Sequence, residues 1–497
     1  MARVVVIGSG MGGMAAAARL SAQGHDVQVI EQSSTHGGKV GRYERDGFVF
    51  DTGPSLVTLP AVYRDLFLKT AVRRANASLE DNLELKALDP AFRYRWWDGS
   101  SVVLPGANHV RVSHALDDAL GGGAGSQWNA FSRRAAAIWA ATRVPFLESP
   151  LTGRDMVRYS RRLSDLRTIA PWSSLRGIGR HYLHDPRLRT LLDRYATYTG
   201  SDPRRAPAAL AVVPYVEQTF GAWHIGGGVR GLADALYERC LERGVNFTFD
   251  ADVARIVIEG GAVSGVSLID SATVGADVVV ANADASAVYG SMLEDPRRRG
   301  PLRSLRRTTP SLAGFVMLLA LKGRTPGIQH HNVWFPEDYD AEFDAVFGGR
   351  TVDDPTVYAC VPDDAAMRPS SDHESWFVLV NAPRHDPATG VDWTSPGLAD
   401  RYADRVLETL ARRGSDVRDR LLWREVRTPY DLERDTRAPG GSIYGTSSNG
   451  RRAAFLRPAN RSPVPGLFLV GGSSHPGGGL PLVGLSAQIV ATQIGPA

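Results

Sequence analysis

The chain has 497 residues, of which 43% are hydrophobic, and its formal net charge is +4 at neutral pH. This length exceeds what one hydrophobic core usually serves and predicts two to four domains. The longest apolar run, Leu312 to Leu321, has ten residues; a helix that crosses a bilayer needs roughly twenty, so we expect a buried strand here and no membrane-spanning helix. Cys240 and Cys360 lack metal-ligand spacing, so neither a disulfide nor a metal site is indicated and a reducing cytoplasm fits.

The first thirty residues read as a strand, a glycine-rich turn, a helix and a second strand. Gly8 permits a tight turn, Gly10 lets the backbone approach a pyrophosphate, and Gly13 lets the helix pack against the strand. Met11 and Gly12 lie in the same turn, where the N-terminus of the helix offers free N–H groups to phosphates. The segment predicts a bound dinucleotide.

Glu31 follows the second strand and identifies the kind of dinucleotide. Its carboxylate can accept hydrogen bonds from both ribose hydroxyls, but it would repel a 2′-phosphate, so NADP is disfavoured. A second glycine pair ends in Gly38 and Lys39, and a short strand then leads into a turn. These features favour FAD held along its whole length, with further candidate cofactor-binding residues at Asp51, Gly53, Pro54 and Ser55. An Asx-turn before Gly53 explains Asp51 equally well.

Strand patterns that suit a cofactor domain occur in three separate parts of the chain. We therefore predict an α/β protein with a discontinuous Rossmann-type FAD-binding domain made of residues 1–104, 223–285 and 426–497. Residues 105–222 are expected to form a helical, basic, membrane-facing subdomain. Residues 286–425, which contain alternating strands such as 376–381, are expected to form an α+β substrate-binding domain.

Residues 131–210 contain fifteen arginines and six acidic residues, a net charge of +9, so the remainder of the chain is net acidic. Apolar residues are interleaved with these arginines: Ile138, Trp139, Val144, Pro145, Phe146, Leu147, Met156 and Val157. This combination suits shallow contact with anionic lipid headgroups, although a solvated helical face explains it equally well. Nucleic acid is not an expected partner, because the arginines are spread over several helical stretches.

The C-terminal region repeats the order strand, glycine-rich turn, helix. Gly472 lies in this turn, and the N-terminus of the following helix could stabilise negative charge on a reduced flavin ring. His475 in the same turn is a weak candidate for a group that assists deprotonation; more often such a histidine hydrogen-bonds a glycine turn. We find no catalytic triad, and the catalytic residues stay unknown.

Several blocks together resemble the bacterial-type phytoene desaturases, the FAD-dependent carotenoid desaturase and isomerase family of amine-oxidase-like flavoproteins. They are the N-terminal fingerprint, residues 194–203 (RYATYTGSDP), residues 440–445 (GGSIYG) and residues 475–479 (HPGGG). The resemblance implies that Gly8, Gly10, Gly13, Glu31, Gly38 and Lys39 line the adenosine and pyrophosphate. It implies that Val253 contacts the adenine side through its backbone and that the flavin is approached by Gly472, Pro481, Leu482 and Val483. The tail departs from the Pro-Gly-Ala-Gly form of many four-step enzymes, so the preferred carotenoid and the number of steps stay open.

The expected activity is that of an FAD-dependent desaturase. It would remove hydride and a proton from an acyclic carotenoid precursor, either phytoene- or neurosporene-like or a hydroxylated derivative. Alternatives are a carotenoid isomerase, a terminal oxidase and a non-catalytic prenyl-chain escort. The enzyme would be cytoplasmic and peripherally bound to the membrane, with quinone or oxygen as electron acceptor. Tyr195 and Tyr198 could line a substrate tunnel, but their spacing also suits packing on one helix face.

Overall fold

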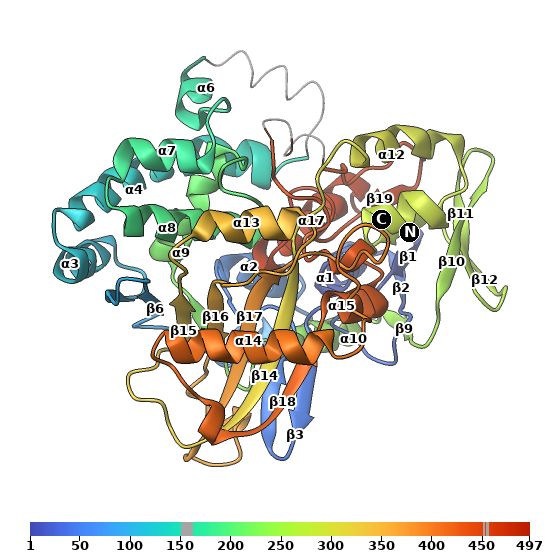
Figure 1. Cartoon of the computed structure of the whole chain (residues 1–497). Coiled ribbons are helices and arrows are strands. Elements are labelled where there is room, and N and C mark those ends of the chain that lie inside the picture. The colour runs from blue at the N-terminus through green and yellow to red at the C-terminus, as the bar shows by residue number, and fades with distance from the viewer. Residues whose placement is uncertain (151–162, 451–452, 454–456) are drawn as a thin grey trace.

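The computed structural model describes residues 1–150, 163–450, 453 and 457–497 (Figure 1). One part of the molecule is built on a five-stranded parallel sheet in the order β19-β13-β1-β2-β9. These strands are β1 (Arg3–Ile7), β2 (Asp26–Ile30), β9 (Asn246–Thr248), β13 (Val278–Ala281) and β19 (Leu467–Leu469). Three distant parts of the chain therefore meet in one sheet, which confirms the discontinuous Rossmann-type domain.

Both faces of this sheet are covered. On one face, an apolar core joins the sheet to α1 (Met11–Ala22), α2 (Ala61–Lys69), α10 (Arg230–Glu242) and α17 (Leu480–Ile494). Ala15 to Ala18 of α1 are fully buried, because their small side chains let the helix pack closely. On the other face lies an antiparallel sheet of β10 (Val253–Glu259), β11 (Ala262–Leu268) and β12 (Thr273–Gly275). The carboxyl ends of the parallel strands meet at one edge, where ligands bind in open α/β sheets.

The second large sheet has seven strands in the order β18-β14-β17-β16-β15-β6-β7. They are β6 (Phe92–Arg95), β7 (Ser101–Leu104), β14 (Ala313–Lys322), β15 (His331–Trp334), β16 (Val357–Cys360), β17 (His373–Ala382) and β18 (Leu421–Arg427). The buried strand expected at 312–321 is thus confirmed as β14. Strands β6 and β7 lie within residues 1–104, which we assigned to the cofactor domain, yet β6 pairs with β15. A four-residue strand carries no signal of the sheet it will join, so this boundary was misplaced.

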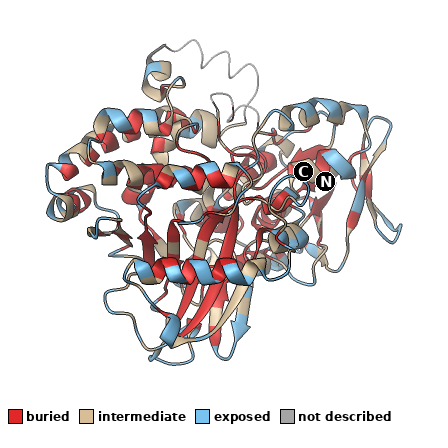
Figure 2. Cartoon of the chain, viewed as in Figure 1, coloured by how far each residue is buried: buried red, intermediate tan, exposed pale blue. Residues whose placement is uncertain are grey.

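Alternation along β14 gives the seven-stranded sheet two distinct faces. Phe315, Met317 and Leu319 pack beneath α14 (Leu398–Arg412), in the core drawn red in Figure 2. Gly314 and Val316 face the other way and line a cavity. Strand β17 alternates in the same way. The sheet therefore presents one wall to an internal space between the two parts of the molecule.

Residues 105–222 are mainly helical, as their composition predicts. The helices are α3 (His109–Leu120), α4 (Ala124–Thr142), α6 (Leu163–Ile169), α7 (Leu175–Tyr182), α8 (Pro186–Arg194) and α9 (Val212–Phe220). They lie together beside the end of the second sheet formed by β15, β6 and β7 (Figure 1). Within the described ranges, no helix combines the length and apolarity needed to cross a bilayer.

The remaining elements connect these layers. They are the hairpin β3 (Arg42–Arg45) and β4 (Phe48–Asp51), the pair β5 (Leu85–Ala87) and β8 (Trp223–Ile225), and helices α11 (Ala285–Ala287), α12 (Arg299–Leu305), α13 (Tyr339–Phe347) and α15 (Pro429–Thr436). Phe48 and Phe50 of the hairpin pack on the second sheet beside Leu318 and Ala320. The hairpin therefore ties the N-terminal segment to the second sheet.

Candidate active site

The turn between β1 and α1 has no room for side chains. A Cβ atom on Gly13 would lie 2.1 Å from the carbonyl oxygen of Gly8, and one on Gly10 would lie 2.7 Å from Nδ2 of Asn282. The first N–H groups of α1 have no acceptor within the helix and point out of this bare turn. The turn thus offers hydrogen-bond donors and a positive helix end to a pyrophosphate.

Glu31 lies at the end of β2, at the edge of the same turn. Its Oε2 accepts hydrogen bonds from the Ser9 backbone N–H at 2.7 Å and from Ser9 Oγ at 2.9 Å. Its Oε1 accepts from the Ser33 N–H and from Ser33 Oγ, each at 2.9 Å. The two backbone groups fix the carboxylate, whereas the serine hydroxyls can rotate away. Ribose hydroxyls can therefore take their places, which fits the predicted role.

One cavity of about 570 Å³ starts at this turn and reaches the second sheet. Its volume is typical of ligand sites. The cavity is bordered by fourteen predicted cofactor-binding residues: Gly8, Gly10, Met11, Gly12, Glu31, Gly38, Lys39, Gly53, Pro54, Ser55, Val253, Gly472, Pro481 and Val483. These residues come from both ends of the chain and from its middle, and the fold brings them together around one cavity.

Three predicted residues do not line the cavity. Gly13 is buried in the contact between α1 and β1, and the Leu482 side chain is not part of the wall. Asp51 accepts hydrogen bonds from the N–H groups of Val229 at 2.8 Å and Arg230 at 3.0 Å, at the start of α10. Burial raises the pKa of Asp51 to about 6, and these two hydrogen bonds act in the opposite direction. Asp51 is therefore placed to hold α10, a role that neither the cofactor prediction nor the Asx-turn interpretation gave.

Lys39 borders the cavity at a different place from the one that the resemblance implied. Its Nζ donates to the carbonyl oxygens of Ile443 at 2.7 Å and Ser442 at 3.3 Å. Burial lowers the pKa of Lys39, and the charge of Asp284 opposes this change. The ammonium group thus joins the N-terminal segment to the loop at 440–445 and does not reach for the turn of α1.

Sequence reasoning missed several groups at this end of the cavity. Asn282 and Asp284, which follow β13, both border it. Arg457 lies behind the wall, where Nη1 donates to the carbonyl oxygens of Gly472 at 2.7 Å and Tyr444 at 3.1 Å. The sequence signal for Asn282 and Asp284 is the buried strand that precedes them, because polar residues after a buried parallel strand lie at the ligand-binding edge of the sheet.

His475 lies outside the cavity lining. Its Nε2 lies 2.9 Å from the carbonyl oxygen of Ser149 and donates to it, and its own carbonyl oxygen accepts from Ser486 Oγ at 2.9 Å. Burial lowers the pKa of His475 to about 4, the Ser149 hydrogen bond acts in the opposite direction, and the charge of Arg457 lowers it further. This geometry favours the role of a turn-stabilising residue.

We expect the His475→Gln variant to lose part of the pH dependence of folding stability. The folded state holds His475 neutral down to about pH 4, whereas in the unfolded chain its pKa is about 6.5. Protonation therefore favours unfolding, and wild type loses about 2 kcal/mol between pH 7 and pH 5 through this residue. Glutamine can still donate to Ser149 but does not titrate. Urea unfolding at both pH values tests this; an equal loss in both proteins would contradict it.

The site fits a bound dinucleotide at each point. The turn before α1 suits a pyrophosphate, Glu31 suits a ribose, and Gly478 to Pro481 bring the start of α17 to the far end of the cavity. That helix end is positive, and the buried Arg457 lies beside Gly477, just before the helix. A flavin ring that gains negative charge on reduction would be stabilised there.

Comparison with known proteins agrees with this geometry. The family model for flavin containing amine oxidoreductases matches residues 11–495. The chain is 32% identical to 4,4'-diapolycopene oxygenase of a Methylomonas species over 99% of this chain and 98% of that protein. It is 33% identical to zeta-carotene-forming phytoene desaturase of Myxococcus xanthus over 99% of this chain and 93% of that protein.

Solved structures support the fold assignment. The crystal structure of an oxidoreductase from Methanosarcina mazei aligns with a TM-score of 0.63 at 18% identity, over 99% of this chain and 100% of that chain. The two proteins thus share a fold despite low sequence similarity. Together with the family match over nearly the whole length, this shows that the chain belongs to the flavin containing amine oxidoreductases and is an FAD-dependent oxidoreductase.

Proposed function

We propose that this flavoprotein is a desaturase that removes hydride and a proton from an acyclic carotenoid precursor. The observation that carries the proposal is the continuity of the cavity, which joins the dinucleotide cradle to an apolar wall. That wall consists of Leu312, Gly314, Val316, Phe377, Leu379 and Ile443. A hydrocarbon chain offers no hydrogen-bonding group, so an apolar wall is what holds it. The names of the two relatives described above are consistent with a substrate of this kind.

The chemistry follows from the substrate. A saturated C–C bond beside a polyene has no acidic C–H, so removal of a proton cannot come first. An allylic carbon loses hydride, the adjacent carbon then loses a proton to water or a weak base, and the electron pair of that C–H bond forms the new double bond. Bound FAD supplies the two-electron acceptor for the hydride. Quinone or oxygen is the proposed external acceptor that restores the oxidised cofactor.

The protein contributes alignment. The wall formed by β14 and β17 holds an extended chain and positions one of its bonds for reaction. Cofactor binding is assigned to the turn of α1, to Glu31 and to the start of α17. No side chain is assigned as the base, since the mechanism requires only a weak one.

Product analysis tests this proposal. Purified protein loaded with FAD is incubated with phytoene, neurosporene and a hydroxylated acyclic carotenoid, and products are analysed by absorbance and mass spectrometry. Desaturation removes two hydrogens and shifts absorbance to the red. Isomerisation keeps the mass, and terminal oxidation adds oxygen. A colourless protein that takes up no FAD would instead support the prenyl-chain escort.

We further propose that the helical subdomain docks on the cytoplasmic membrane surface, where the substrate dissolves. Exposed apolar side chains support this: Val144 is 57% exposed, Trp172 is 56% exposed and Phe220 is 37% exposed. The charge count of this region supports it less than expected, because several of its arginines also form ion pairs with acidic residues outside residues 131–210. These pairs are Arg176 with Asp340, Arg187 with Asp98 and Arg204 with Asp344. Met156 and Val157, which we included in the amphipathic pattern, lie outside the described residues.

We expect the double variant Val144→Ser and Trp172→Ser to bind liposomes roughly tenfold more weakly, since it removes apolar area that would enter the headgroup region. The matched control is Ile269→Ser, because Ile269 is 65% exposed but lies in the turn after β11, far from this subdomain (Figure 1). Flotation with anionic and neutral vesicles at low and high salt is the measurement. Equal binding to anionic and neutral vesicles would contradict the electrostatic part of the proposal. An equal loss of binding in the Ile269→Ser control would contradict the assignment of the docking surface.

A further inference from the structure

Besides Lys39, the buried guanidinium of Arg194 borders the cavity. Arg194, the last residue of α8, is 6% exposed and borders the cavity. Its Nη1 donates a hydrogen bond to Tyr198 Oη at 2.6 Å. Among the described residues, its other guanidinium nitrogens have no hydrogen-bond acceptor, and they are not sealed from the cavity. Their donors are therefore available to whatever occupies it.

Aromatic rings hold the guanidinium group in place. Its central carbon lies 5.0 Å from the ring centre of Tyr198, 5.4 Å from that of Tyr358 and 5.9 Å from that of Tyr94. Tyr358 is itself fixed, because its Oη lies 2.8 Å from both Ser55 Oγ and His331 Nδ1. Arg194 is thus preorganised, and binding requires little further ordering of this long side chain.

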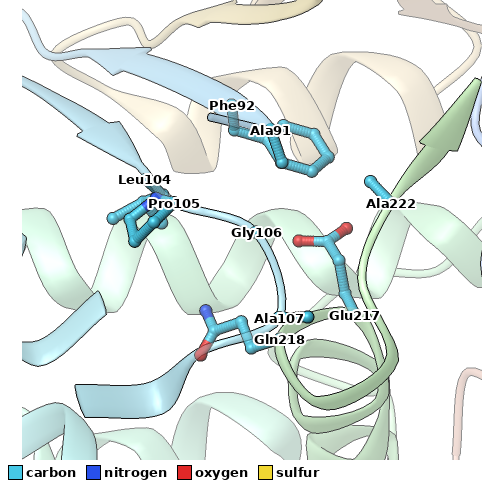
Figure 3. Close-up of a pocket in the computed structure, with 9 residues that line it drawn as sticks. All are labelled: Ala91, Phe92, Leu104, Pro105, Gly106, Ala107, Glu217, Gln218 and Ala222. Carbon is cyan, nitrogen blue, oxygen red and sulfur yellow. The ribbon is translucent and has the colours of Figure 1, made fainter. Parts of the chain in front are cut away.

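The charge of Arg194 is already balanced within the protein. Tyr198 Oη donates to Glu217 Oε2 at 3.0 Å, and Tyr195 Oη donates to Glu217 Oε1 at 2.6 Å. Burial raises the pKa of Glu217, whereas the Tyr195 hydrogen bond and the charge of Arg194 act in the opposite direction. On its other side Glu217 borders a separate cavity of about 10 Å³, shown in Figure 3 beside Ala91, Gly106 and Ala222, a volume close to that of one water probe. The network of one guanidinium, two phenols and one carboxylate therefore does not need an anion from the ligand.

From this geometry we infer that Arg194 and Tyr198 form a binding site for a neutral oxygen atom, a hydroxyl, ether or carbonyl, at one end of the carotenoid. This inference rests on the proposed function and narrows its substrate class. A pure hydrocarbon would cover the free N–H donors without replacing their hydrogen bonds, which costs free energy. An oxygen acceptor satisfies them. With one end held, the position of the chain along the cavity is fixed, so the site also selects the bond that reacts.

The test compares two chains that differ in one group, neurosporene and its derivative with a terminal hydroxyl. We expect wild type to show a kcat/KM about 10- to 100-fold higher for the hydroxylated chain, the range that a hydrogen bond to a charged donor gives. We expect Arg194→Met to bring the ratio of the two kcat/KM values, hydroxylated chain over neurosporene, towards one. Because Arg194→Met leaves Glu217 without its counter-charge, the paired variant Arg194→Met with Glu217→Gln is measured as well, and the flavin absorbance of each variant verifies that cofactor is bound.

Two tyrosines provide a matched control. Tyr198→Phe and Tyr195→Phe each remove one phenol that donates to Glu217, but only Tyr198 borders the cavity. Tyr198→Phe is expected to lower the ratio and Tyr195→Phe to leave it unchanged. Equal kcat/KM for both chains in wild type, or a preference for a terminal carboxylate, would overturn the inference while the desaturase function stands. Conversion of none of phytoene, neurosporene and the hydroxylated derivative would remove the proposed function and this inference with it.

Discussion

Gly13→Ala protein is expected to be purified without FAD and to have no activity. The added Cβ would lie 2.1 Å from the carbonyl oxygen of Gly8 and 3.2 Å from Cβ of Asn282. The first of these is backbone at the end of a central strand and cannot move without moving β1. Overpacking of this kind costs about 1–3 kcal/mol, and the resulting shift of α1 withdraws its N–H groups from the pyrophosphate. The ratio of visible flavin absorbance to protein absorbance, together with the melting temperature, measures the effect.

Gly300→Ala is the control for this substitution. Gly300 lies in α12, and a Cβ there would meet nothing within 4 Å. Alanine in place of a helical glycine is expected to be neutral or to stabilise by up to about 1 kcal/mol. Full retention of FAD by Gly13→Ala, at a melting temperature equal to that of the control, would contradict the role given to this turn.

The second large effect is expected from Glu217→Ala. Glu217 is 5% exposed and is the acceptor for two buried phenols. Without it, the buried Arg194 guanidinium loses the carboxylate that it reaches through Tyr198, and an uncompensated buried charge costs up to about 3–5 kcal/mol. The phenol hydroxyls of Tyr195 and Tyr198 also lose their acceptor. The melting temperature should therefore fall by several degrees.

A double-mutant cycle separates charge from packing. If charge compensation is the cause, adding Arg194→Met to Glu217→Ala restores part of the lost stability, since the unpaired cation is gone. Thermal unfolding of the two single variants and the double variant gives the coupling energy. If the stability lost by the double variant equals the sum of the losses in the two single variants, Arg194 and Glu217 act independently. That result would contradict the proposed network.

Local signals in the sequence were sufficient for the cofactor-binding half of the molecule. The strand, glycine turn and acidic residue that end at Glu31 form a unit whose geometry depends on near neighbours, so the residue types alone define it. The same holds for β14, where a continuous apolar run predicts a strand buried on both faces. For these elements, the local sequence pattern and the observed structure agree.

Non-local features could not be predicted in the same way. Strand β6 joins β15, more than 200 residues further along the chain, and nothing within Phe92–Arg95 indicates that partner. Cys360 pairs with His331 across β15 and β16, so that its sulfur and one ring nitrogen each of His330 and His331 lie within 4.8 Å of one another. Arg194 was interpreted as part of a basic stretch; its contact with Tyr198 is local, but its contact with Tyr358 arises only when helix and sheet meet.

The five-stranded sheet also has a consequence for how the protein is made. Its edge strand β19 and helix α17 come from the last thirty-odd residues, whereas the turn of α1 is translated first. Contacts between such distant segments form late, because the intervening chain must be gathered before they can close. A complete flavin pocket therefore requires that β19 and α17 have been synthesised, and a ribosome-bound nascent chain that lacks them holds an unfinished pocket.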